Sequence, residues 1–127
     1  MNIGSMGDFS VPYATIYGGS KGFNMTWSSS LAMELKSEGK NVEVLAISVG
    51  RVTDVSHHKK DASFFTPSAR TMARAALQRV GCGKSVVVGY VGHALQKFLV
   101  GLLPFSITSR AVTTLMKDVW KQSQRNQ

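Results

Sequence analysis

An apolar stretch that directly follows a long helical segment limits this chain to few folds. Residues Val42 to Ser48 are apolar except for Glu43, which is typical of a strand buried in a parallel sheet. Apolar side chains at helical spacing predict a helix from Tyr17 to Glu38, and Gly39 ends it. Because the connection between helix and strand is short, the two form half of a βαβ unit. The sequence therefore predicts an α/β protein.

The other elements follow from turn residues and apolar periodicity. Residues 1–5 predict the end of a strand, and residues 6–16 predict a loop. A second helix is expected from Pro67 to Val80, with Pro67 in its first turn and Thr66 as its cap. The sequence then predicts a last parallel strand at Ser85–Val88 and two helices at Val91–Leu103 and Thr108–Ser123, divided near Pro104.

Two sets of apolar side chains are assigned by their helical spacing. Phe23 and Trp27 lie on the long helix, and we expect them in the core rather than at an interface between two copies. The last helix carries an apolar stripe opposite Lys117 and Lys121, so that helix is predicted to be amphipathic. The stripe consists of Val112, Leu115, Met116, Val119 and Trp120.

The phenol of Tyr17 and the ammonium group of Lys21 lie one helical turn apart, so both face the same side of the helix. A fixed cation beside a phenol favours its ionised form, which suits proton transfer at neutral pH. The hydroxyl of Ser5, a short loop upstream, is placed to hold a substrate oxygen by a hydrogen bond. Together these groups suit proton transfer to a carbonyl that is reduced by hydride.

The surroundings of these three residues resemble a known family over nearly the whole chain. The segments are Asn2-Ile3-Gly4-Ser5, Val11-Pro12, residues 16–23, residues 30–35, residues 42–50, Pro67-Ser68-Ala69, residues 80–83, residues 86–90 and His93-Ala94-Leu95. In this order they resemble the second half of a short-chain dehydrogenase/reductase, closest to the branch of very-long-chain 3-oxoacyl-CoA reductases and 17β-hydroxysteroid dehydrogenase type 12. The resemblance implies the C-terminal half of a Rossmann-like, doubly wound parallel sheet with extra C-terminal helices.

The resemblance also implies an NADP(H)-dependent reductase of a lipid ketone, either a 3-oxoacyl-CoA in very-long-chain fatty-acid elongation or a steroid. Tyr17 would donate the proton, Lys21 would support Tyr17 and hold the nicotinamide ribose, and Ser5 would polarise the carbonyl. The loop after the central strand stands where many members carry Pro-Gly and a spaced Thr beside the nicotinamide amide. Its expected cofactor contacts, besides Tyr17 and Lys21, are Val49, Gly50, Val52 and Thr53.

The chain departs from the family pattern in three respects. Ser5 stands one residue closer to Tyr17 than the family's serine does, and Gly4 occupies the family position. In the cofactor loop Gly50 matches, whereas Val49 replaces the proline and Thr53 is displaced by one place. No Gly-rich turn of the G-x-G-x-x-G type precedes a helix, so nothing here predicts a pyrophosphate site.

We therefore interpret the chain as a C-terminal portion of a longer reductase. Residues 1–90 are expected to form a partial Rossmann-like reductase domain and residues 91–127 to form amphipathic C-terminal helices. The isolated 127-residue chain is expected to be inactive. The alternative function is that of a truncated half that acts only by dimerisation through helix 17–38 or by membrane association.

The net charge of +8 comes from the C-terminal half, where residues 64–127 hold nine Lys and Arg against Asp118. The charge-free apolar part, residues 98–109, is shorter than the roughly 20 residues that a helix needs to cross a bilayer. The basic residues Lys97, Arg110, Lys117, Lys121 and Arg125 flank it. This pattern suits a segment at the surface of an anionic membrane, and the alternative is that its apolar residues line an acyl or steroid pocket. With the resemblance, it implies the cytosolic face of the endoplasmic reticulum membrane.

Metal and nucleic-acid sites are not expected. Cys82 is the lone cysteine, and the pair His57-His58 has no Cys or carboxylate at ligand spacing, so we predict no metal and assign the loop of residues 49–66 as a substrate lid. The basic residues are not interleaved with aromatic residues in a stacking pattern, so no nucleic-acid partner is predicted.

Overall fold

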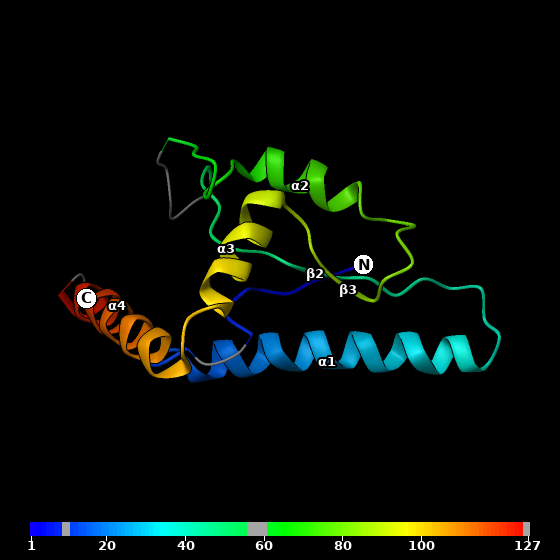
Figure 1. Cartoon of the computed structure of the whole chain (residues 1–127), viewed down its shortest axis with the longest axis horizontal. Coiled ribbons are helices and arrows are strands. Elements are labelled where there is room, and N and C mark those ends of the chain that lie inside the picture. The colour runs from blue at the N-terminus through cyan, green and yellow to red at the C-terminus, as the bar shows by residue number, and fades with distance from the viewer. Residues whose placement is uncertain (9–10, 56–60, 126–127) are drawn as a thin grey trace.

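The computed structural model describes residues 1–8, 11–55 and 61–125, which form an α/β structure of three strands and four helices. The elements are β1 (Asn2–Ile3), α1 (Thr15–Ser37), β2 (Ala46–Ser48), α2 (Ala69–Leu77), β3 (Val86–Val88), α3 (Val91–Gly101) and α4 (Phe105–Arg125). In Figure 1 the strands run between α1 on one side and α2 on the other. The predicted α/β class and its partial Rossmann-like arrangement are confirmed.

The three strands form one parallel sheet in the order β1-β2-β3, with Asn2 opposite Ala46 and Ile47 opposite Val87. The central strand is shorter than the predicted Val42–Ser48 because its neighbours begin only at Asn2 and Val86. Parallel pairing places the carboxyl ends of all three strands at one edge of the sheet. The loops that leave β1 and β2 at that edge are therefore neighbours.

The core lies between the sheet and α2, where Leu45 and Ile47 of the central segment pack against Met72 and Ala76. The opposite face of the sheet meets α1 through the side of the helix that carries Gly18, Met25 and Ser28. Both faces of β2 are thus covered, since all three of its residues are buried. Burial on both faces explains why Leu45, Ala46 and Ile47 are apolar in succession instead of alternating with polar residues.

The expectation that Phe23 and Trp27 belong to the core is wrong, because their side chains are 69% and 47% exposed. Both residues lie on the side of α1 opposite Met25, and only one side of the helix meets the sheet. Helical spacing identified an apolar stripe, but it could not say which stripe faces the strands. The alternative, in which these side chains pack against a second copy, stays a prediction.

Helix α2 begins at Ala69 instead of Pro67, and its cap is Ser68 instead of Thr66. The Ser68 side chain accepts a hydrogen bond from the Thr71 N–H at 3.2 Å, as an N-cap does. The helix cannot start earlier because the Pro67 carbonyl accepts a hydrogen bond from the Thr53 N–H at 3.0 Å, which holds that backbone extended against a loop.

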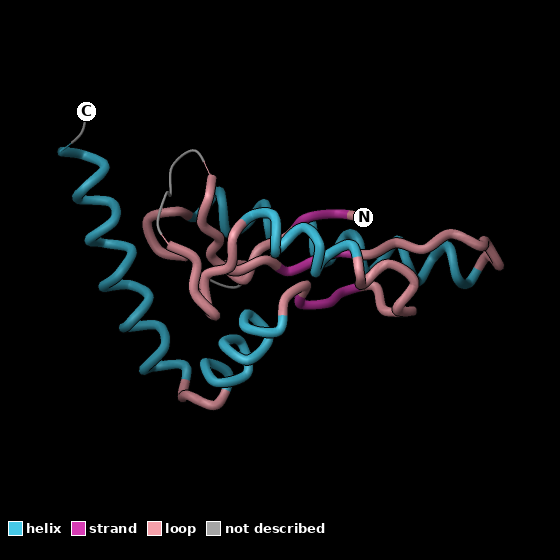
Figure 2. Tube along the Cα trace, turned by 90° about the horizontal axis from the view of Figure 1, so that it is seen from above, coloured by secondary structure: helices cyan, strands magenta, loops and turns pink. Residues whose placement is uncertain are grey.

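Helices α3 and α4 meet at Pro104, as predicted, and α4 extends away from the sheet (Figure 2). No residue of α4 is buried, and its main aromatic contact joins Trp120 to Tyr13, with ring centroids 5.7 Å apart. Within the described residues, no helix combines the length and apolarity needed to cross a membrane. The predicted apolar stripe on this helix is therefore largely uncovered.

The start of α3 is packed too tightly for any side chain at Gly92. A Cβ there would meet the Phe64 carbonyl oxygen and would lie 2.7 Å from Tyr90 Cε1, whereas a Cβ at Gly101 in the same helix meets nothing within 4 Å. We expect Gly92→Ala to lower the free energy of unfolding by about 1–3 kcal/mol. Gly101→Ala should leave it unchanged or raise it by up to about 1 kcal/mol. Urea unfolding followed by circular dichroism compares the two variants, and equal stability would contradict this packing.

Candidate active site

Ser5 and Tyr17 meet at the carboxyl edge of the sheet. Ser5 lies two residues after the end of β1, and Tyr17 lies in the first turn of α1. The Tyr17 hydroxyl donates a hydrogen bond to Ser5 Oγ at 3.1 Å, and the Gly7 N–H donates to the same oxygen at 3.1 Å. The tyrosine ring is half-exposed, so the pair is open to solvent on one side. A small molecule can reach both hydroxyl groups.

Lys21 completes this group one turn further along α1. Its Nζ lies 5.7 Å from the centroid of the Tyr17 ring, close enough for a cation–π interaction. The spacing of four residues places the ammonium group on the same side of the helix as the phenol. The structure thus brings together all three residues that the sequence predicted as catalytic.

The one-residue difference in spacing has a structural explanation at Gly4. Gly4 is buried against α1, and a Cβ at this position would collide with Sδ of Met25. A side chain at position 4 would point into the packing between β1 and the helix. Ser5, one residue further, projects toward Tyr17 instead. The hydroxyl at position 5 is therefore the one that the geometry can use.

Glycines in and after the tyrosine–lysine motif allow the loop after β1 to lie on α1. A Cβ at Gly22 would be 3.0 Å from the Asp8 carbonyl oxygen, and one at Gly18 would be 3.6 Å from the Gly7 carbonyl oxygen. Gly18 and Gly22 are four residues apart, so they form one small-residue groove on the helix. The sequence analysis did not recognise their role, although this spacing was the signal for it.

The second loop of the site follows β2 and is joined to the first. The Met6 N–H donates to the Val49 carbonyl at 2.9 Å, so the segment after Ser5 lies beside the predicted cofactor loop. Two residues on from Gly50, the Val52 N–H and C=O have no hydrogen-bond partner within the part of the chain that the structure describes. A free N–H and C=O on one residue match the acceptor and donor of a carboxamide.

Thr53 lies differently from Val52. Its side chain is buried, its N–H donates to Pro67, and its carbonyl accepts from the Ala69 N–H at 3.0 Å. The residue therefore fastens the loop to the start of α2. Its predicted cofactor contact stays a prediction, as do those of Val49, Gly50 and Val52.

His93 is a residue of this edge that the sequence analysis missed. It lies in the first turn of α3 and is fully buried. The Gly50 N–H donates to Nδ1 at 3.1 Å, so Nε2 must carry the ring proton, and it donates to the Arg51 carbonyl at 3.0 Å. Burial lowers the pKa of His93 below its ordinary value of 6.5, an effect that the carbonyls of Arg51 and Phe65 partly offset. The imidazole is therefore held in its neutral form. In the sequence, His93 appeared only within the segment His93-Ala94-Leu95 of the resemblance, with no role assigned to it.

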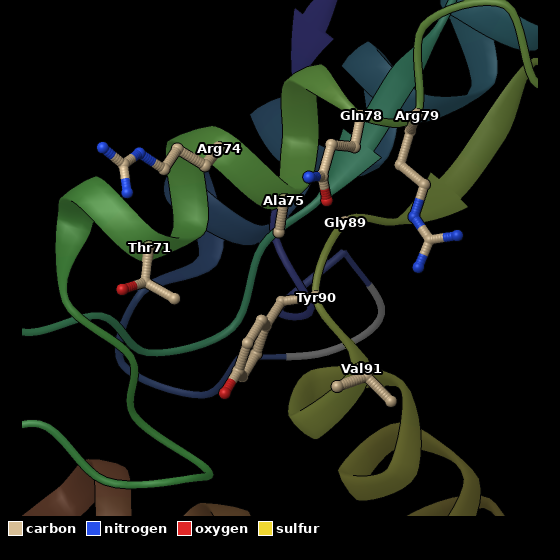
Figure 3. A pocket seen from close by; sticks show the side chains of 8 residues that line it. All are labelled: Thr71, Arg74, Ala75, Gln78, Arg79, Gly89, Tyr90 and Val91. Carbon is tan, nitrogen blue, oxygen red and sulfur yellow. The ribbon is translucent and has the colours of Figure 1, made fainter.

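A cavity of about 370 Å³ lies elsewhere, between α2 and the turn from β3 to α3. It is lined by Thr71, Arg74, Ala75, Gln78, Arg79, Gly89, Tyr90 and Val91. The side chains of Arg74 and Arg79 extend to opposite sides of this cavity (Figure 3), so they do not converge on a common anion. None of its lining residues belongs to the Ser5–Tyr17–Lys21 group.

Metal ligands do not gather anywhere in the described residues, since no group of three His, Cys, Asp or Glu side chains is close enough to share an ion there. Within the predicted lid of residues 49–66, the pair His57-His58 belongs to residues 56–60, which lie outside the described residues.

A parallel sheet whose first strand leads to a serine, followed by a helix with a tyrosine and a lysine one turn apart, matches the arrangement expected for the second half of a short-chain dehydrogenase/reductase. Known proteins agree with that class. The chain is 30% identical to a very-long-chain 3-oxoacyl-CoA reductase of Candida glabrata over 122 residues, which cover 91% of the chain and 34% of the relative. It is 37% identical to the protein of that name in Scheffersomyces stipitis over 77% of the chain and 30% of the relative.

A very-long-chain 3-oxoacyl-CoA reductase-like protein of Arabidopsis thaliana is 33% identical over 88% of the chain and 33% of its own length. The chain spans about a third of the length of the curated relatives that it matches. Neither a family model nor a solved structure matches it. The relatives confirm the resemblance to the short-chain dehydrogenase/reductase family over most of the chain, and the resemblance to the steroid dehydrogenase stays a prediction.

The neutral state of His93 makes stability depend on pH. Because its folded pKa lies below the unfolded value of 6.5, the unfolded chain binds the proton more readily. The contribution to the free energy of unfolding is fully present above about pH 6.5 and is lost as the pH falls through the folded pKa, by at most about 1.4 kcal/mol per pH unit. Urea unfolding at pH 7.5, 6.5 and 5.5 should therefore show a gap between the wild type and His93→Gln that narrows as the pH falls. Other histidines are shared by both proteins, so a constant gap would contradict the assignment.

Proposed function

We propose that this chain forms the catalytic portion of a short-chain reductase that reduces the keto group of a 3-oxoacyl-CoA with NADPH. The observation that carries the proposal is the hydrogen bond from Tyr17 to Ser5 with the ammonium group of Lys21 beside the ring. The names of the relatives support the substrate class. A steroid ketone is the alternative substrate that the resemblance implies.

Ser5 is prepared to donate a hydrogen bond to a ketone oxygen. Its Oγ accepts from the Tyr17 hydroxyl and from the Gly7 N–H, so both of its lone pairs are used. Its own proton is then left for an incoming acceptor. The Gly7 N–H fixes the position of the oxygen, and the hydrogen bond from Ser5 polarises the carbonyl.

Tyr17 supplies the proton to the ketone oxygen. When that oxygen takes the place of Ser5 Oγ as the acceptor, the phenol proton lies along the new hydrogen bond. The phenolate that remains after transfer is stabilised by the nearby ammonium group of Lys21. Each of these groups acts without moving far from its position in the structure.

The residues present fit the nicotinamide end of a dinucleotide. Lys21 would hold the ribose hydroxyls. The Val52 N–H and C=O, which have no partner among the residues that the structure describes, would hold the carboxamide. When bound, the nicotinamide supplies the hydride. We propose NADPH instead of NADH on the resemblance alone.

The alternative proposal is that the polypeptide acts only by association. It predicts that the 127 residues do not bind NADPH, so a titration that follows NADPH fluorescence discriminates between the two. Saturable binding that is weakened by Lys21→Met would favour the reductase.

Tyr17→Phe tests the catalytic assignment. This change removes the only proton donor on the ring and keeps the ring beside Lys21. In the longer reductase that carries these residues, we therefore expect turnover of a 3-oxoacyl-CoA to fall by about 10²- to 10⁴-fold. NADPH affinity should stay within a few-fold of the wild type. Steady-state kinetics followed by NADPH absorbance measures both quantities.

Tyr13→Phe is the matched control. Tyr13 lies in the loop between Ser5 and Tyr17, and its ring contact with Trp120 does not need the hydroxyl. Turnover of this variant should equal that of the wild type. Retained turnover in Tyr17→Phe would reject the assignment.

We further propose that the tip formed by α3 and α4 lies on an anionic membrane surface, as at the cytosolic face of the endoplasmic reticulum. Phe98, Leu102 and Phe105 at this tip are 63%, 66% and 75% exposed. Lys97 and Arg110 flank them. Exposed apolar side chains flanked by basic residues are typical of interfacial helices.

Partition to vesicles tests this surface. With vesicles that contain an anionic phospholipid, Leu102→Asp combined with Phe105→Asp should weaken binding by about 10-fold or more, because two apolar side chains lose their burial in lipid. Ile16→Asp combined with Leu77→Asp adds the same charge at exposed apolar positions elsewhere and should leave binding much less affected. Equal losses in the two pairs would contradict the proposed surface, and co-sedimentation measures both.

A further inference from the structure

We infer that His93 is a positioning residue that fixes the loop at residues 49–51 and, through that loop, the segment that carries Ser5. The inference rests on the proposed function for its effect on catalysis. Its structural part, that the imidazole holds this loop, stands on distances and burial alone. Nothing in the motifs of the sequence assigned His93 a role.

The imidazole forms hydrogen bonds with two successive residues of the loop backbone. Gly50 donates to one ring nitrogen, and Arg51 accepts from the other, so the loop wraps around the ring edge. His93 has no exposed surface, and water therefore cannot replace either bond. A buried N–H or C=O left without its partner costs about 1–3 kcal/mol.

The Val49–Gly50 peptide carries this restraint to the catalytic residues. Its N–H is bound to His93, and its C=O accepts the Met6 N–H at 2.9 Å. Met6 directly follows Ser5, whose Oγ accepts the Tyr17 hydroxyl. A continuous path of hydrogen bonds thus leads from α3 through one rigid peptide plane to the chain segment beside the phenol.

Gly50 is required by the same contact. A Cβ on Gly50 would lie 2.7–2.9 Å from three atoms of the His93 ring, so the loop backbone rests directly on the imidazole. The ring itself is held from behind by Tyr90, with centroids 5.4 Å apart in an edge-to-face arrangement. The imidazole cannot retreat from the loop without disturbing the turn that leads into α3.

Three substitutions at His93 separate the two bonds. His93→Phe keeps a flat ring and removes both bonds. His93→Asn can keep an acceptor near the position of Nδ1 for Gly50, and His93→Gln can keep a donor near the position of Nε2 for Arg51. Tyr90→Phe is the matched control, since it keeps the ring that packs on His93.

Hydrogen exchange tests the loop restraint without any assay of activity. In the wild type the Gly50 amide should be protected, and in His93→Phe its exchange should accelerate by about 10-fold or more. His93→Asn should restore most of the protection, and Tyr90→Phe should leave it unchanged. An unchanged exchange rate of the Gly50 amide in His93→Phe would overturn the inference, regardless of the catalytic activity of the variant.

Kinetics of the folded fraction test the catalytic consequence. We expect His93→Phe to raise the KM for NADPH and to lower kcat, each by about 10-fold or more, because a displaced loop misplaces both cofactor and Ser5. A residue that only stabilises the fold would lower the melting temperature and leave both constants unchanged, which would overturn the positioning role. Absence of turnover in the longer reductase that carries these residues would instead reject the proposed function, and the exchange experiment would then decide the role of His93.

Gly50→Ala provides a second route if His93→Phe does not fold. The added methyl group should push the loop from the imidazole and reproduce the same rise in KM and fall in kcat. Combined with His93→Asn, it should be no worse than either change alone, because both act on one contact. Losses that simply multiply in the double variant would contradict a shared contact.

Discussion

The hydrogen bond between the Met6 N–H and the Val49 carbonyl is the contact on which the site depends. It continues the parallel pairing of β1 and β2 beyond the ends of both strands. Without it, the loop that carries Ser5 and the loop predicted to meet the cofactor would be two independent segments. Because they are joined, a displacement of either loop is passed to the other, and the short strands do not need to be long to set the geometry.

At the carboxyl edge of the sheet, several glycines allow the backbone to pack closely against its neighbours. A side chain at Gly4 would collide with Met25, one at Gly22 would contact the Asp8 carbonyl oxygen, and one at Gly50 would collide with the His93 ring. Because glycine has no side chain, the backbone at each of these positions can lie in direct contact with a neighbouring side chain or backbone segment. The glycines near Tyr17 therefore belong to the packing of the catalytic loop. They are separate from the phosphate-binding turn that the sequence analysis sought and did not find.

The parts of the fold that were predicted well are those with a strong local pattern. The helix after Ser5, the apolar strand ending at Ser48 and the break at Pro104 all appear where the periodicity or the proline indicated. The cap of α2 was wrong because the pairing of Thr53 with the Pro67 carbonyl overrides a local preference for proline in the first turn. Phe23 and Trp27 were misplaced because a helical stripe says nothing about which side meets the sheet.

The sequence by itself determined that Tyr17 and Lys21 share one helix face, since their spacing of four residues is close to the 3.6-residue period. It also indicated the α/β class, because a short, mostly apolar stretch directly after a long helix is typical of a strand that is covered on both faces. Only the tertiary structure decided that the Ser5 hydroxyl is hydrogen-bonded to the phenol of Tyr17, and that His93 holds the loop at Gly50. The first contact joins residues that are 12 positions apart in the sequence, and the second joins residues that are 43 positions apart. A local sequence pattern does not predict which distant groups a side chain will contact.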